Sequence, residues 1–157
     1  MLFFFSWEQR KLGDIFKYER PDEYIVFSDK YLDNCKIPVL TANKAFILGY
    51  TDEVNTYNNP SIIFDDFTLD SKYVDFPYMV KSSAIKILTI NDKKRDNLRF
   101  NFDLLINTKI EIMGHARHYI SVVQPTEVKT TISKEQDKIS EFFTQLDIII
   151  TLHQRKP

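Results

Sequence analysis

Three aspartates and a lysine lie close together between positions 65 and 72. Asp65 and Asp66 follow the apolar run 62–64, and Asp70 lies two residues before Lys72. Metal-dependent nucleases use a similar set, because carboxylates hold Mg²⁺ and a lysine lies near the attacking water. Those enzymes carry the acid-x-Lys pair on a following strand, whereas Asp70 lies just after Asp66. Two interpretations stay open: a small Mg²⁺-dependent nuclease, or carboxylates that accept backbone N–H bonds in turns.

A second polar segment, GHARHY, begins at Gly114. It holds His115 and His118, but no Cys or acidic residue lies at the spacing that would complete a zinc site. Glycine favours a turn, so we expect the segment to form an exposed loop. Arg117 suits a guanine with two hydrogen bonds, and the histidines and Tyr119 suit base edges or phosphates. The segment therefore predicts a nucleic-acid contact and no metal site.

Other short polar segments separate the apolar runs of the chain. Their hydroxyls, amide and lysines suit contacts with phosphates and base edges. Ordinary turn chemistry accounts for the same residue types. The candidate contact residues in these segments are Thr41, Asn43, Lys44, Thr68, Lys72, Lys81, Ser82 and Ser83.

Motifs for catalysis on DNA are incomplete. The segment Asn58-Asn59-Pro60-Ser61 lacks the second proline and the aromatic residue with which an adenine methyltransferase holds its flipped base. The sequence has neither a glycine-rich cofactor loop nor a Walker-type phosphate loop. We therefore expect no catalytic residues and no cofactor.

Length, composition and charge restrict the class of protein. A chain of 157 residues is one domain with a short appendage, and 43% hydrophobic residues are enough for a sizeable core. The single cysteine excludes an internal disulfide. The net charge of −1 does not favour nucleic-acid binding, yet the segment 71–120 holds nine basic and five acidic residues. A basic face on a neutral protein is therefore consistent with the sequence, as is ordinary charge scatter.

The location of the protein follows from its apolar segments. No apolar run approaches the roughly 20 residues of a membrane span. The opening segment 1–5 is apolar, but it is too short for the apolar region of a signal peptide and no basic residue precedes it. We expect a cytoplasmic protein without a membrane partner.

The apolar patterns predict an α+β fold. Strands are expected near 24–27, 37–41, 45–50, 61–67, 73–77, 79–80, 84–90, 109–113, 119–123 and 127–132. Helices are expected from about position 8, over 97–107, and from 132 onward. Because strands and helices do not alternate regularly, a doubly wound parallel sheet is not expected. We expect a compact domain over 1–131 with a strongly curved mixed β-sheet and short helices, followed by a protruding C-terminal α-helix over 132–157.

The C-terminal helix has an apolar stripe. Ser133 and Gln136 have the spacing of a capping box, which marks the helix start. Two interpretations stay open for the stripe: packing on the helix's own domain, or packing on a partner helix. The apolar residues fall mostly three or four apart, at Ile139, Phe142, Phe143, Leu146, Ile149, Ile150 and Leu152.

Both ends of the chain resemble the specificity subunits of type I restriction-modification systems. Near the N-terminus, WEQRKLG from Trp7 to Gly13 resembles the beginning of a target recognition domain. The C-terminal segment resembles the start of the family's conserved spacer helix. The residues that carry this second likeness are Glu135-Gln136, Lys138-Ile139, Phe142-Phe143, Leu146-Asp147, Ile150 and Leu152-His153-Gln154-Arg155-Lys156.

The resemblance implies a protein that reads double-stranded DNA without catalysing a reaction. The domain would bind one half of a bipartite site through its loops, including the segment ahead of Ile120-Ser121. The helix would dock modification subunits, which supply adenine methylation, and through them the restriction subunit. Because the chain carries one domain and one helix, a homodimer reading an interrupted palindrome is expected. A module that competes for modification subunits without reading DNA is a further alternative. The expected helix contacts are Ile139, Phe142, Phe143, Leu146, Ile149, Ile150 and His153.

Overall fold

The computed structural model describes residues 7–154. The apolar opening segment 1–5 and the last three residues of the expected helix region lie outside the described residues. The elements follow in the order β1 (Glu8–Lys11), α1 (Leu12–Ile15), β2 (Phe16–Glu19), a 3-10 turn (Asp22–Tyr24), β3 (Ile37–Leu40), β4 (Ile47–Thr51), β5 (Ser61–Asp65), β6 (Ser71–Val74), β7 (Met79–Val80), β8 (Ile85–Ile90), α2 (Leu98–Asn107), a π-helical turn (Tyr119–Val123), β9 (Glu127–Thr130) and α3 (Ser133–Gln154).

The central sheet has the antiparallel order β2-β8-β5-β6. Successive side chains of a strand point to opposite faces, and β5 uses both faces for the core. Ile62 and Phe64 belong to one apolar cluster, which also includes Leu105 of α2, whereas Ile63 belongs to a second cluster with Leu40 and other residues. The predicted burial of 62–64 on both faces is confirmed, because all three side chains are at most 1% exposed.

A second sheet has the order β4-β3-β7 and makes the fold mixed. The strands β3 and β7 are parallel, with Val39 opposite Met79 and Leu40 opposite Val80. The segments that follow these two strands, 41–44 and 81–83, therefore leave the sheet at the same edge. The expected α+β architecture is confirmed, with the β structure divided among three small sheets in the described part of the chain.

A two-stranded ribbon joins the beginning of the described chain to the start of the last helix. Antiparallel pairing brings Glu8 of β1 opposite Thr130 of β9, directly before α3. The helix predicted from about position 8 is therefore wrong for 8–11, and only 12–15 are helical. The pairing partner lies more than 110 residues away, so local spacing does not show it.

Three predicted strands are absent. In the segment 24–27, Tyr24 ends the 3-10 turn and Ile25 forms an isolated bridge with Val80 instead of a strand. The segment 109–113 has no regular element, and 119–123 is a π-helical turn. Valine, isoleucine and tyrosine favour strands in general. Here the buried Tyr119 and Val123 lie four residues apart on one side of the turn and face the core.

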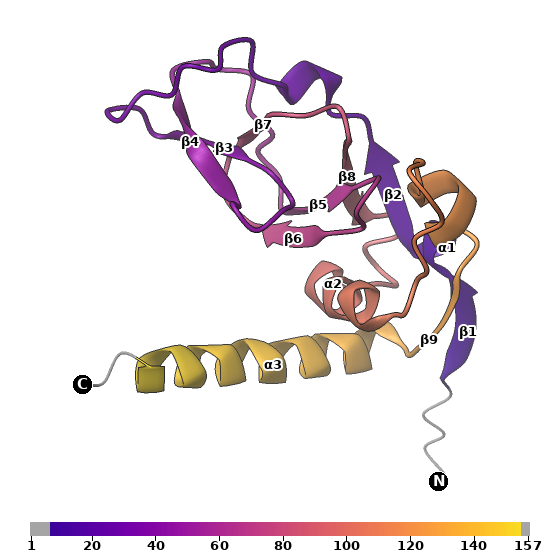
Figure 1. The fold of residues 1–157 in the computed structure, drawn as a ribbon. Coiled ribbons are helices and arrows are strands. Elements are labelled where there is room, and N and C mark those ends of the chain that lie inside the picture. The colour runs from indigo at the N-terminus through magenta and orange to yellow at the C-terminus, as the bar shows by residue number, and fades with distance from the viewer. Residues whose placement is uncertain (1–6, 155–157) are drawn as a thin grey trace, which may run out of the picture.

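The helix α3 protrudes from the domain, as predicted. Figure 1 shows that it begins beside α2 and β9 and extends beyond α2 toward the C-terminus at the left. Within the described helix only Gln136 and Ser140 are buried, and both lie in its first half. No helix within residues 7–154 is long and apolar enough to cross a bilayer.

Candidate functional site

Three segments that are far apart in the sequence meet at one end of the domain. The turn between β5 and β6 contacts the segment after Gly114, where the Phe67 and His115 rings stack with their centroids 5.4 Å apart. Arg117 Nη1 lies 3.5 Å from the Ser83 carbonyl oxygen, in the turn before β8. The exposed predicted contact residues of these three segments, here named the loop surface, are Thr68, Ser82, Ser83, His115 and Arg117.

The turn between β3 and β4 lies beside the loop surface. Because β3 and β7 are parallel, residues 41–44 and 81–83, which follow these strands, begin at the same end of the sheet. Asn43 and Lys44 are exposed, whereas Lys81 is partly buried and forms an ion pair with Asp29. Thr41 is half-buried, and its hydroxyl is turned inward. Asn43 and Lys44 are therefore the accessible predicted residues of this turn.

Lys72 lies apart from these turns. It is half-buried within β6, opposite Ile63 of β5. As a strand residue it does not belong to the loop surface.

Asp66 fixes the shape of the segment 113–119. Its carboxylate is buried, and Oδ1 accepts hydrogen bonds from the backbone N–H groups of His118 (3.0 Å) and Tyr119 (2.7 Å). Oδ2 lies 3.4 Å from Lys86 Nζ and 3.3 Å from Arg117 Nη1. Burial raises the pKa of Asp66, but the Tyr119 N–H and the charge of Lys86 outweigh it and leave the pKa lowered. Asp66 is therefore a charged anchor for this segment at neutral pH.

The buried imidazole of His118 closes the same segment. Its Nε2 accepts a hydrogen bond from the backbone N–H of Met113 (2.9 Å). Its Nδ1 lies 3.2 Å from the Asp66 carbonyl oxygen, so Nδ1 must carry the proton. The side chain thus joins both ends of the segment to the β5–β6 turn.

The prediction that His118 and Tyr119 are exposed contact residues is wrong. His118 is 1% exposed and Tyr119 is fully buried. The Tyr119 ring packs edge-on against Phe64 and Tyr18, at centroid distances of 5.5 Å and 5.3 Å. Burial raises the pKa of the Tyr119 phenol. Neither side chain can reach a base, because both anchor the segment from inside.

The acidic pair at the end of β5 serves the backbone. Asp65 Oδ1 accepts hydrogen bonds from the N–H groups of Phe67 (2.8 Å) and Thr68 (2.9 Å). Both carboxylate oxygens of Asp66 have the partners described above. Of the two interpretations left open by the sequence, the geometry therefore supports carboxylates that organise turns. Within residues 7–154, no group of three or more His, Cys, Asp or Glu side chains is arranged to hold a metal ion.

A second polar cluster joins α3 to the domain through Gln136, which is fully buried. Its Nε2 donates to Asp96 Oδ1 (3.1 Å) and to the Thr131 carbonyl oxygen (2.8 Å). Its Oε1 accepts from the N–H of Asn97 (2.9 Å) and from Asn101 Nδ2 (3.1 Å). The predicted capping box is therefore wrong, because the Gln136 amide points into the domain and does not return to Ser133.

The same cluster includes a buried ion pair. Arg10 of β1 donates to both oxygens of Asp96, with distances of 2.6 Å and 2.9 Å. The hydrogen bond to Asp96 raises the pKa of Arg10. Sequence reasoning did not select Arg10, Asp96 or Gln136 as site residues. Arg10 and Gln136 do lie in the two motifs that carry the family resemblance, and the resemblance is the sequence feature that could have identified them.

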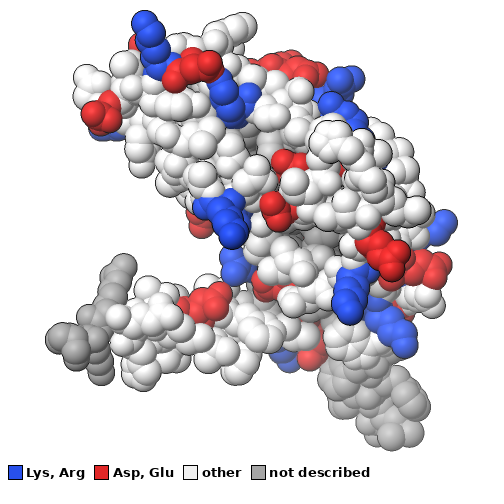
Figure 2. All heavy atoms as spheres, viewed as in Figure 1, with Lys and Arg blue, Asp and Glu red and all other residues white. Residues whose placement is uncertain are grey.

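The apolar stripe of α3 faces away from the domain. Its members Phe142, Phe143, Leu146, Ile149 and Ile150 are between 39% and 62% exposed, and Ile139 is half-buried. Figure 2 shows that the protruding half of the helix presents mostly uncharged atoms on the visible face. Positions 139, 142, 146, 149 and 153 alternate in steps of three and four, the spacing of a coiled-coil seam. Leu152, in contrast, lines the groove between α3 and the domain.

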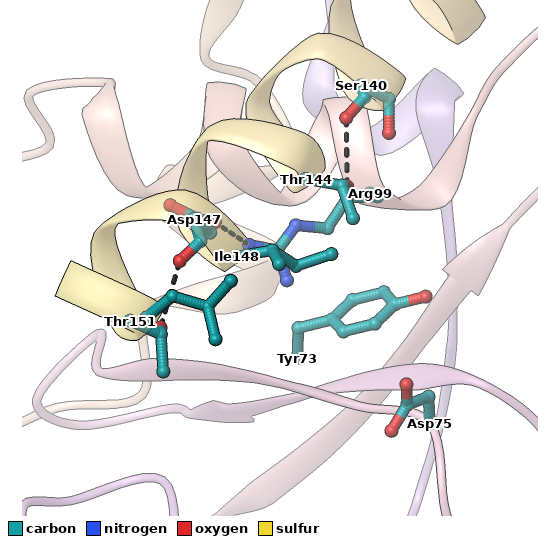
Figure 3. A pocket seen from close by; sticks show the side chains of 9 residues that line it. Tyr73, Asp75, Arg99, Ser140, Thr144, Asp147, Ile148 and Thr151 are labelled. Carbon is teal, nitrogen blue, oxygen red and sulfur yellow. Dashed lines mark hydrogen bonds and ion pairs between the residues drawn. The ribbon is translucent and has the colours of Figure 1, made fainter. Parts of the chain in front are cut away.

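The groove between α3 and the domain has a volume of about 630 Å³. Figure 3 shows Arg99 of α2 reaching across it to Asp147 of α3. The Arg99–Asp147 distance is 3.3 Å, and the guanidinium also lies over the Tyr73 ring at 5.1 Å. The stripe and the groove therefore occupy opposite sides of α3.

Comparisons with known proteins identify the family of the chain. The family model described as "Type I restriction modification DNA specificity domain" matches residues 6–157. The chain thus belongs to the family of type I restriction-modification specificity proteins. It is 44% identical over 116 residues to the specificity subunit of the type I restriction enzyme EcoR124I/EcoR124II of Escherichia coli, and the match covers 70% of this chain and 29% of the relative.

Solved structures of the same family share the fold. The S subunit of a type I restriction-modification system from M. genitalium has a TM-score of 0.67 and 14% identity, covering 91% of this chain and 39% of that chain. The HsdS subunit from Thermoanaerobacter tengcongensis has a TM-score of 0.57 and 12% identity, covering 95% and 39%. The chain therefore spans about 29% to 39% of the length of these relatives.

Proposed function

We propose that this chain is a DNA-reading module that directs methylation and restriction to a bipartite site and catalyses neither reaction. In this proposal the loop surface and the adjacent turn 41–44 bind one half of the site on double-stranded DNA. Modification subunits supply adenine methylation, and the restriction subunit joins through them. The observation that carries the proposal is the meeting of three loops, rich in donor groups, on an anchored end of a specificity-family domain.

The chemistry of the loop surface supports contact with DNA. Arg117 and the neighbouring Lys44 offer positive charge to phosphates, and the hydroxyls of Ser82 and Ser83 can donate to phosphates or base edges, whereas the Thr68 hydroxyl donates to Asp70 Oδ2 (3.0 Å). Of the three carboxylates in the turn beside Arg117, Asp65 and Asp66 are buried and accept backbone N–H groups, and Asp70 is exposed. The outer face of this end therefore favours a polyanion more than the net charge of −1 suggests.

The uncovered stripe of α3 supports pairing with a second helix. A helix with several apolar side chains in water is stable only when this face is covered. We propose that two copies pair through Ile139, Phe142, Leu146, Ile149 and His153, with Phe143 and Ile150 at the flank. A two-fold pair presents two identical loop surfaces and would read an interrupted palindrome.

A second candidate is a module that docks modification subunits without reading DNA. The near-neutral net charge favours it. The two candidates differ in their dependence on salt, because neutralising phosphates releases counterions and steepens the loss of affinity with added salt.

The test is a DNA titration of the chain in complex with its modification subunits, at several salt concentrations. We expect the affinity to fall steeply with salt, and Arg117→Ala to weaken binding to target DNA by about 1–3 kcal/mol. Asp103→Asn serves as a control because this half-buried residue lies on α2, outside the loop surface. A complex whose DNA affinity is independent of salt and of Arg117 would contradict the reader and favour the docking module.

A further inference from the structure

Arg117 is held by contacts on two sides. Nη1 points inward to Asp66 Oδ2 (3.3 Å) and toward the Ser83 carbonyl oxygen (3.5 Å). The guanidinium carbon lies 5.1 Å from the centre of the Phe67 ring. Aromatic stacking and a carboxylate together restrict the rotation of a long side chain that would otherwise sample many rotamers.

The side chain nevertheless remains accessible, at 53% exposed. Nη1 is the only atom of Arg117 that donates a hydrogen bond within residues 7–154. Nε and Nη2 are therefore available for a ligand. An arginine with two free donors in one plane matches the O6 and N7 acceptors of guanine in the major groove.

We infer that Arg117 reads a guanine of the target, and that Phe67 and Asp66 are positioning residues that hold its guanidinium for this contact. This inference rests on the proposed function and names the base at one position of the half-site. Phe67 contributes through its ring face, which orients the guanidinium plane. Asp66 contributes through Oδ2, which holds Nη1 while Oδ1 fixes the backbone of the same segment.

Lys86 reduces the attraction of the Asp66 carboxylate for the Arg117 guanidinium. It is 10% exposed, and its Nζ lies 3.4 Å from the oxygen of Asp66 that Arg117 approaches. Because Lys86 already offsets the charge of Asp66, the ion pair between Asp66 and Arg117 orients the guanidinium without neutralising it fully. Arg117 therefore keeps charge for a base edge or an adjacent phosphate.

The test is a map of adenine methylation in cells that express the chain with its cognate modification subunits. The variants are Arg117→Ala, Phe67→Leu, Phe67→Tyr and Asp66→Asn. We expect Arg117→Ala to weaken the specificity at one guanine position of the methylated motif. The preference for guanine over other bases at that position should fall roughly 10- to 100-fold. Phe67→Leu should relax the same position partly, and Phe67→Tyr should keep it because the stacking ring remains. Asp66→Asn should relax that position among the molecules that stay folded.

Phe76→Leu is the matched control, because Phe76 is also half-buried and packs against Phe46 in the second apolar cluster. It should leave the motif unchanged. An unchanged motif with Arg117→Ala, or relaxation at a base other than guanine, would overturn the inference while the proposed function stands. Relaxation with Arg117→Ala but not with Phe67→Leu would overturn the positioning role of Phe67. No methylation with the wild-type chain would instead overturn the proposed function, and the inference with it.

Discussion

Gln136 Nε2 donates a hydrogen bond to Asp96 Oδ1 across 3.1 Å, although the two residues are 40 positions apart. Asp96 is also bound by Arg10 of β1, so one cluster connects the first described strand, the start of α2 and the start of α3. The direction in which α3 leaves the domain is therefore set by buried polar contacts near its first turn. The rest of the helix carries the apolar stripe into solvent.

Replacing Gln136 by leucine should destabilise the fold. The substitution leaves the Asn97 N–H and the Thr131 carbonyl oxygen without the amide of Gln136, and it removes one of the hydrogen bonds of Asp96 Oδ1 and of Asn101 Nδ2. We expect a loss of about 2–4 kcal/mol in the free energy of unfolding, measured by urea denaturation. Gln145→Leu on the exposed part of the same helix is the control and should change it by less than about 0.5 kcal/mol. Equal effects of the two substitutions would contradict the role of the Gln136 cluster.

Much of the fold follows from local patterns in the sequence. The run Ile62-Ile63-Phe64 predicts a strand buried on both faces, and the apolar stripe of 139–150 predicts a helix with one apolar side. Both succeed because a continuous apolar run and a three-four spacing have few other solutions. The segment 119–123 fails, because the buried Asp66 carboxylate caps the N–H groups at its start and favours a turn over a strand.

The site was predictable only in part. Several of the predicted polar loop residues lie close together, but their proximity depends on the parallel pairing of β3 with β7 and on Asp66, which spacing does not show. Histidine is a polar residue type for which exposure was predicted here. His118 is nevertheless buried, because both of its ring nitrogens have hydrogen-bond partners within the fold. Gln136 has the spacing of a capping residue and serves a tertiary contact instead.

Asp66 should make the stability of the domain depend on pH. Its pKa in the folded state is lowered from the ordinary value of 3.8, so the charged form stabilises the fold above that value. This contribution is lost as the pH falls from the ordinary pKa through the lowered one. Asp66→Asn should lose about 1–3 kcal/mol at neutral pH and show a smaller loss of stability on acidification below pH 4.

The control for the pH series is Asp70→Asn, an exposed position in the same turn. Its stability should decline on acidification as in the wild type, measured by denaturant unfolding at each pH. A wild-type and an Asp66→Asn protein with parallel pH profiles would contradict the assignment of the charged anchor to Asp66.

Charged residues placed on the stripe should weaken self-association. In a two-fold pair, Leu146→Asp removes the buried leucine from both helices. Each lost side chain should cost about 1.5–3 kcal/mol in the free energy of association. We therefore expect the dimer dissociation constant, measured by sedimentation equilibrium, to rise by at least about 100-fold. Gln145→Asp lies next to Leu146 on the exposed helix surface but off the stripe, and it should leave association nearly unchanged. Monomeric wild-type protein at all concentrations would contradict pairing through α3.

Lys44 should contribute to DNA binding without contributing to sequence choice. It is exposed in the turn beside the loop surface and has no ion pair among the described residues. Lys44→Ala should weaken binding to target and non-target DNA alike and reduce the salt slope by about 1. Lys138→Ala, on the exposed side of α3, should leave both quantities unchanged. A change confined to target DNA would assign Lys44 to base reading instead.

The most direct measurement of the proposed function is a genome-wide map of methylated adenines in cells that express the wild-type chain with its cognate modification subunits. Two identical loop surfaces related by the paired α3 helices predict new methylation in one interrupted palindrome. An asymmetric bipartite motif would show that the domain reads DNA but pairs with a different partner. No new methylation, with all subunits present and soluble, would contradict the reading of DNA by this chain.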